Sequence, residues 1–154
     1  VQGFEGSVTG QVLPHFNLMA AYTYLNPVIT DDATTPFNVG KQITFVPKHA
    51  VSLWGDYDAG ALVKGLSAGG GVVYQSHLFN GYTAPNPATY PLGRIVRIPE
   101  TVELDAVLAY DFKPYRIQFN VNNLTDRLNY SQSFGNRGTP APGRTFIVSL
   151  EAAL

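Results

Sequence analysis

The stretch that decides the fold is residues 102–121, which read VELDAVLAYDFKPYRIQFNV. Apolar or aromatic side chains occupy every second position on both sides of Lys113-Pro114, and many intervening positions are polar, such as Glu103, Asp105 and Gln118. A period of two residues is typical of a β-strand with one apolar face. The Lys113-Pro114 step interrupts the pattern, so the stretch predicts two long strands joined by a tight turn.

The same alternation recurs along the whole chain and predicts an all-β fold with no helix. The 15 Gly and 11 Pro among 154 residues also argue against a helical bundle. The predicted apolar faces carry no charged residue. We expect seven antiparallel meander strands, within residues 4–12, 16–24, 51–57, 66–74, 102–112, 115–121 and 146–154.

The predicted strands have the length and the aromatic ends that a membrane requires. They run to about 9–11 residues, enough to cross a bilayer at a tilt, whereas strands of soluble proteins are nearer 5–6 residues. Interfacial aromatic residues are expected near strand ends, where this chain has Tyr22, Tyr24, Tyr57, Tyr74, Tyr110, Phe112 and Tyr115. Because hydrocarbon supplies no hydrogen-bond partners, we expect the strands to form part of a transmembrane β-barrel with a polar lumen.

The connections between the predicted strands alternate strictly between short and long. The short ones lie at residues 13–15, 59–65 and 113–114, and the long ones at residues 26–48, 75–100 and 125–143. All long loops would then emerge at one end of the sheet. Outer-membrane barrels have this asymmetry, with short periplasmic turns and long extracellular loops.

Composition excludes several classes of protein. The 10 Lys and Arg against 11 Asp and Glu give a net charge of −1, so no nucleic-acid partner is expected. The chain has no cysteine, and therefore no disulfide framework or thiolate metal site. No stretch approaches the ~20 apolar residues of a membrane-spanning helix. Residues 1–5 do not resemble a signal peptide, so we expect an export signal to have been upstream or removed.

Eight short motifs follow one another along nearly the whole chain. They are Gly3-Phe4-Glu5-Gly6, Ala21-Tyr22-Thr23-Tyr24, Val46-Pro47-Lys48-His49, Ser52-Leu53-Trp54 with Tyr57, Gly69-Gly70-Gly71-Val72-Val73-Tyr74, Leu104-Asp105-Ala106 with Tyr110, Asn120-Val121-Asn122-Asn123-Leu124-Thr125-Asp126 and Gly143-Arg144. Each motif is weak alone, but their order and spacing together resemble the barrel of TonB-dependent outer-membrane receptors, especially the siderophore receptors.

The resemblance implies that residues 1–154 are the C-terminal part of a larger barrel in the outer membrane of a Gram-negative-type cell. The family's receptors have 22 strands and an N-terminal plug, so the plug and the upstream strands are absent from this chain. The implied partners are a ferric siderophore, outer-membrane lipid, the receptor's own plug, and the TonB complex through the missing N-terminal region. Iron would arrive inside the substrate, so no cofactor, protein metal site, catalytic residue or enzymatic activity is expected.

The long loops hold the candidate ligand-binding residues. Aromatic and guanidinium side chains suit an anionic, aryl-bearing ferric siderophore through stacking, cation–π contact and charge-assisted hydrogen bonds. An ordinary loop that packs its own aromatic residues is the alternative explanation. The candidates are His77, Phe79, Tyr82, Tyr90, Arg94 and Arg97 in the second long loop, and Phe134 and Arg137 in the third.

Three other functions stay open from the sequence. A small outer-membrane porin or adhesin would need an even number of strands. A barrel hydrolase would need a Ser/His/Asn or Asp/His set at one rim, and no such set is evident. A soluble β-sandwich binding module would bury the same apolar faces between two sheets. Glu103, Asp105 and Asp111 are expected to line the polar lumen wall rather than to form an acid–base pair or a cation site.

Overall fold

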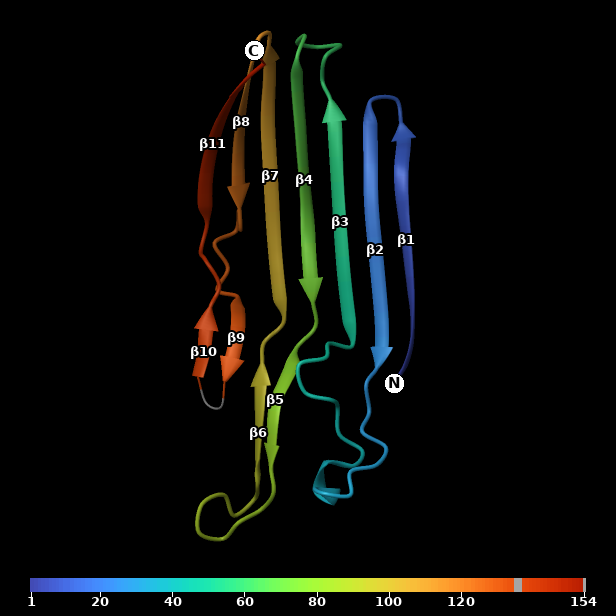
Figure 1. Cartoon of the computed structure of the whole chain (residues 1–154), viewed down its shortest axis with the longest axis vertical. Coiled ribbons are helices and arrows are strands. Elements are labelled where there is room, and N and C mark those ends of the chain that lie inside the picture. Colours follow the sequence, from blue (N-terminus) through green and yellow to red (C-terminus); the bar gives the residue numbers. More distant parts are fainter. Residues whose placement is uncertain (135–136, 154) are drawn as a thin grey trace.

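The main element of the computed structural model, which describes residues 1–134 and 137–153, is a seven-stranded antiparallel sheet (Figure 1). Of Gln132 and Phe134 the backbone alone is described. The sheet confirms the prediction of seven long meander strands. In order across it they are β1 (Gln2–Leu13), β2 (Phe16–Asn26), β3 (His49–Asp58), β4 (Leu66–Gln75), β7 (Thr101–Phe112), β8 (Tyr115–Asn122) and β11 (Thr145–Ala152).

The long connections contain short strands that the alternation did not predict. β5 (Leu78–Thr83) pairs with β6 (Arg94–Ile98), and β9 (Tyr130–Phe134) pairs with β10 (Arg137–Pro140). These hairpins project beyond the end of the main sheet (Figure 1). Because they need no continuous apolar face there, their apolar residues do not recur at every second position. A short 3₁₀ turn, η1 (Pro36–Asn38), lies in the first long loop. Within the described ranges, no helix has the length and apolar character needed to span a membrane.

The strand register places the predicted apolar residues on one common face. Phe119, for example, pairs with Leu108 on one side and with Val148 on the other. This face is exposed, with 61% of Phe4 and 65% of Val148 accessible. The two smaller sheets are the hairpins beyond the sheet's end (Figure 1). No second sheet therefore covers the apolar face within the described residues, and the soluble-sandwich alternative is wrong.

The turns confirm the predicted sorting of connections. The short turns lie at one end of the sheet, and the three long connections lie at the other, which we call the outer end (Figure 1). Because every neighbouring pair is antiparallel, β1 and β11 run in the same direction. Closing this sheet with antiparallel pairs alone requires an odd number of further strands. The described strands therefore do not form a small closed barrel by themselves.

Aromatic side chains mark both ends of the apolar face. At the outer end, the ring of Phe4 lies 5.5 Å from that of Tyr22 and 5.8 Å from that of Tyr24. The Tyr22 hydroxyl is hydrogen-bonded to Nδ1 of His49 at 2.9 Å. At the opposite end, Tyr110, Phe112 and Tyr115 form a row with centroids 5.7 Å apart. The two groups confirm the predicted aromatic belts, because amphipathic rings are favoured at membrane–water interfaces.

The opposite, lumen-facing side explains two of the three consecutive glycines in β4, Gly69 and Gly71. The Trp54 ring lies over Gly69 and Gly71, so that a Cβ added at Gly71 would come within 2.6 Å of the indole and would also contact the Leu53 carbonyl oxygen. Two predicted lumen carboxylates have structural partners there. Asp111 pairs with Arg116 at 2.9 Å, and Asp105 accepts a hydrogen bond from the Asn123 backbone at 2.9 Å.

Candidate ligand-binding site

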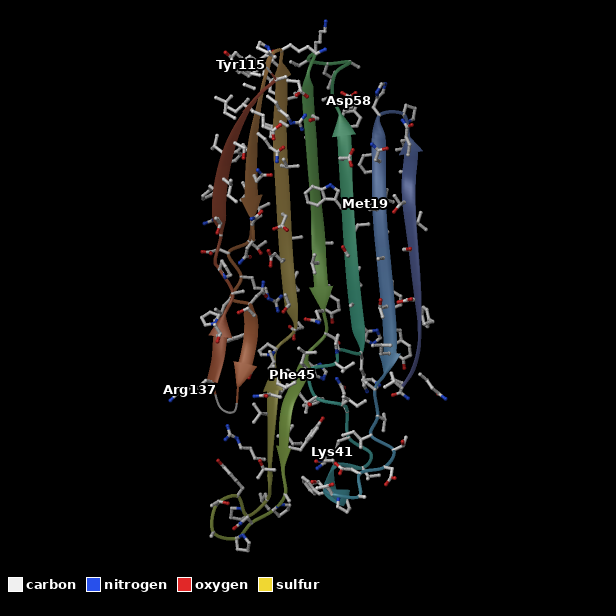
Figure 2. All side chains as sticks on the ribbon, in the orientation of Figure 1. Met19, Lys41, Phe45, Asp58, Tyr115 and Arg137 are labelled. Carbon is white, nitrogen blue, oxygen red and sulfur yellow. The ribbon has the colours of Figure 1, made fainter. Side chains whose placement is uncertain are left out.

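The three long connections are joined to one another at the outer end. The first outer loop (residues 27–48) contacts β5, where the backbone N–H of Phe45 donates to the Phe79 carbonyl at 2.8 Å. The Asn80 amide of β5 donates to the Ser133 hydroxyl of β9 at 2.9 Å. Segments far apart in the sequence therefore form one continuous surface beyond the sheet, on which Figure 2 labels Lys41, Phe45 and Arg137.

Lys41 links the first outer loop to Tyr82. Its ammonium nitrogen lies 2.7 Å from the ring centroid of Phe37 and 5.0 Å from that of Tyr82, a cation–π arrangement. Among the described residues the ammonium has no hydrogen-bond partner, and desolvation lowers the pKa of Lys41. The Tyr82 hydroxyl donates to the Gln42 carbonyl at 2.9 Å. Sequence reasoning did not select Lys41, because forty-one positions separate it from Tyr82.

The candidates His77, Phe79 and Tyr82 form an aromatic row that begins directly before β5 and continues along it. The His77 ring meets Phe79 edge-on at 5.3 Å, and Phe79 lies 5.5 Å from Tyr82. Burial raises the pKa of Tyr82. Burial, and secondarily the charge of Arg97, lowers the pKa of His77. The row packs against the first outer loop through Tyr82, and a role for these rings in ligand binding stays a prediction.

The lowered pKa of His77 predicts a pH dependence of stability. As the pH is lowered, His77 takes up a proton in the unfolded chain at its ordinary pKa of 6.5, and in the folded chain only at a lower pH. Stability therefore falls as the pH drops through 6.5 toward the lowered folded-state pKa, and the loss is absent above 6.5. We expect the difference in unfolding midpoint between about pH 7.5 and about pH 5.5 to shrink in His77→Gln. An equal difference in that variant would contradict the assignment.

Tyr90 and Arg94 form a separate pair at the tip of the β5–β6 hairpin. The Arg94 guanidinium lies 5.5 Å from the Tyr90 ring and donates to its hydroxyl at 3.2 Å. A backbone bridge between Asn86 and Tyr90 shapes this tip. Tyr90 is exposed and Arg94 is half-buried. The pair follows directly after the aromatic row in the hairpin, because Arg94 lies opposite Thr83, the residue after Tyr82.

Arg97 and Arg137 come together on one groove although they belong to different hairpins. The groove, about 320 Å³ in volume, lies between the β5–β6 and β9–β10 hairpins. Neither arginine pairs with a carboxylate in the part of the chain that the structure describes, so both guanidinium groups are available to an anion. The groove is lined by Val96, Arg97, Ile98, Pro99, Tyr130, Ser133, Arg137 and Gly138.

Two groove residues, Tyr130 and Ser133, were not among the sequence candidates. Both lie on β9, a strand of the last hairpin that the alternation did not reveal. Their phenol and hydroxyl add hydrogen-bonding groups beside the two arginines. Phe134 ends β9, and its side chain lies outside the described residues.

Buried amides organise the chain between β8 and β9. Asn123 is 2% exposed and has a left-handed backbone with φ of 50°. Its side-chain amide donates to the carbonyls of Arg127 at 2.9 Å and Pro142 at 3.3 Å, and its oxygen accepts from the Arg127 N–H at 3.0 Å. The motif Asn123-Leu124-Thr125-Asp126 therefore joins both ends of the last outer loop.

Comparison with known proteins agrees with this architecture. Residues 1–124 match the family model described as TonB dependent receptor-like, beta-barrel. The ferric-pyoverdine M114 receptor PbuA of a Pseudomonas species is 32% identical, over 98% of this chain and 18% of that relative. The probable TonB-dependent siderophore receptor PiuA of Acinetobacter baumannii is 26% identical, over 97% of this chain and 20% of that relative. The chain thus spans about a fifth of the length of these relatives.

Solved structures show the same fold. The pyoverdine outer-membrane receptor FpvA of Pseudomonas aeruginosa superposes with a TM-score of 0.79 at 22% identity, over 99% of this chain and 21% of that one. The ferric-catecholate import receptor Fiu of Escherichia coli gives a TM-score of 0.75 at 25% identity, over 96% and 20%. This chain therefore belongs to the TonB-dependent receptor family, and its open sheet is part of an outer-membrane β-barrel.

Proposed function

We propose that this chain is the C-terminal barrel segment of a receptor that imports an anionic ferric siderophore across the outer membrane. The observation that carries the proposal is the groove in which Arg97 and Arg137 converge beside Tyr130. Guanidinium groups without carboxylate partners bind anions through charge-assisted hydrogen bonds, and a phenol ring can stack on an aryl group. The named relatives are receptors for siderophores rather than catalysts, which supports a transport role without an enzymatic step.

The strands that close the barrel, the plug and the connection to TonB belong to the proposed full-length receptor. Further strands, odd in number, would close the barrel, and a plug would fill its lumen. A connection from the N-terminal region to the TonB complex would supply energy for import. Iron would enter as part of the chelate, so the segment itself needs no resident metal or cofactor.

The experiment replaces both groove arginines with alanine in the full-length receptor. Charge-assisted hydrogen bonds are worth about 1.5–3 kcal/mol each, so Arg97→Ala/Arg137→Ala is expected to weaken chelate binding at least about 100-fold. Binding and uptake of ⁵⁵Fe are measured on whole cells with two probes, a ferric pyoverdine and a ferric catecholate. A proton uncoupler should abolish uptake and leave surface binding intact, as energy supplied through TonB requires.

Two further variants make the result specific. Lys64→Ala removes a cation from a short turn at the opposite end of the sheet, and we expect wild-type binding. Arg94→Ala tests the hairpin tip, and we expect a change below about threefold, because this arginine lies at the Tyr90 pair rather than in the groove. Wild-type affinity for both probes in the double arginine variant would contradict the proposal.

A further inference from the structure

A buried amide, Asn129, joins the last outer hairpin to the start of β7. Its side chain is 2% exposed. The amide nitrogen donates to the Val102 carbonyl at 2.9 Å, and the amide oxygen accepts from the Val102 N–H at 3.3 Å. Both polar atoms of one side chain thus bind both backbone groups of one residue, as a neighbouring strand would.

The same residue closes the base of the β9–β10 hairpin. The Asn129 carbonyl accepts a hydrogen bond from the Ala141 N–H at 2.8 Å, across the two ends of the hairpin. Arg127, two residues earlier, pairs with Glu100 at 2.9 Å. The base of this hairpin is therefore bound to residues 100 and 102, immediately after the strand that carries Arg97.

These contacts lie next to the two-arginine groove. Tyr130, which follows Asn129 directly, lines the wall from β9. Pro99, which directly follows β6 and lies three residues before Val102, lines the other wall. At the far side, Asn80 and Ser133 connect the hairpins again. Any rotation of the β9–β10 hairpin about the Asn80–Ser133 contact would change the separation of Arg97 and Arg137.

We propose that Asn129 is a positioning residue, which sets the separation of the two hairpins and thereby of the Arg97 and Arg137 guanidinium groups. The role of Asn129 in holding the two hairpins at a fixed separation is argued from the contacts above. The effect of that separation on ligand affinity rests on the proposed function. Removal of the amide leaves the Val102 N–H and carbonyl without their partner, whereas the Arg127–Glu100 and Asn80–Ser133 contacts persist. Loosening of the hairpin is therefore expected rather than loss of the barrel.

The geometric test needs no ligand. The 154 residues contain no cysteine. In a full-length receptor in which every other cysteine has been replaced, Thr83→Cys on β5 and Thr139→Cys on β10 place one spin label on each hairpin, and the receptor is inserted in lipid vesicles. Double electron–electron resonance should show a broader distance distribution in Asn129→Ala. The matched control is Asn86→Ala. The Asn86 side chain accepts a hydrogen bond from the Ala88 N–H at the hairpin tip, so its removal should leave the distance distribution unchanged.

A second variant covers failure of Asn129→Ala to reach the membrane. Asn129→Leu keeps the number and branching of the side-chain heavy atoms, adds no charge, and removes both hydrogen bonds to Val102. We expect a broadening similar to that of Asn129→Ala. An unchanged label distribution in whichever variant inserts would overturn the positioning role, whether or not any chelate binds.

The affinity test separates positioning from general structural damage. Asn129→Ala is expected to weaken binding of ferric pyoverdine or ferric catecholate about tenfold. In a background that already lacks both groove arginines, the same change should have no further effect, because its influence passes through those arginines. An equal additional loss in that background would overturn the inference. A third outcome separates the two proposals. If Asn129→Ala broadens the label distances but Arg97→Ala/Arg137→Ala leaves chelate affinity unchanged, the proposed function is rejected and the geometric role of Asn129 is retained.

Discussion

Replacing Leu53 with arginine is expected to destabilise the folded receptor in a bilayer by about 2–4 kcal/mol, the range for a cation at the midplane of a barrel's lipid face. Leu53 lies midway along β3, between Ala20 and Val72 in the register, and 41% of it is exposed on the apolar face. The guanidinium would have to shed water or thin the bilayer locally, because hydrocarbon offers no hydrogen-bond partner. Equilibrium unfolding in phospholipid vesicles measures the loss.

The neighbouring Ser52 supplies the matched control. It lies on the lumen face of the same strand, opposite Ala21 and Val73, so Ser52→Arg places the same charge at the same depth in a polar environment. We expect a change within about 0.5 kcal/mol. Equal stability of the two variants would show that the exposed apolar face does not meet lipid.

Asn123→Ala is expected to cost about 3–5 kcal/mol, the other large effect. The substitution removes three hydrogen bonds, to the Arg127 N–H and to the carbonyls of Arg127 and Pro142, and each such bond is worth about 0.5–1.5 kcal/mol. Alanine also tolerates a left-handed backbone less well than asparagine does. Denaturant unfolding of the full-length receptor in vesicles gives the magnitude.

Asn123→Gly separates the two contributions. Glycine accepts the φ of 50° but provides no amide, so it should be more stable than the alanine variant by about 1 kcal/mol. Asn120→Ala is the control. Among the described residues its amide makes one hydrogen bond, which it accepts from Gln118 on the lumen face, so a loss below about 1 kcal/mol is expected. If Asn123→Ala were no worse than Asn120→Ala, the buried amide network would have no stabilising role.

The barrel wall could be predicted because its physics is local. In β7, Val102, Leu104 and Leu108 alternate with Glu103, Asp105 and Val107, and the register places each group on the expected face. A strand between lipid and water must repeat every two residues, so its sequence records both its conformation and its environment. The short strands β5, β6, β9 and β10 were not predicted because they lie past the end of the main sheet (Figure 1). There neither face has to be continuously apolar, so no alternation marks them in the sequence.

The candidate site could be predicted only in its residue types. Arginines and aromatic residues in the long loops suggested anion binding, but forty positions separate Arg97 from Arg137, and no spacing rule relates residues on two different loops. Tyr130 and Ser133 entered the groove through the same hairpin packing. Tyr82 lay among the ligand candidates, and the structure also gives it a contact with Lys41 of the first outer loop.

By itself the sequence determined the seven wall strands, their two faces, their aromatic ends and the end from which the long loops emerge. These features follow from a period of two residues set by a lipid side and a wet side. Tertiary structure alone decided which arginines share a groove and which amides bind the last hairpin to β7. Those contacts join loops through individual hydrogen bonds between distant residues, such as Asn129 and Val102, and such bonds leave no repeating pattern in the sequence.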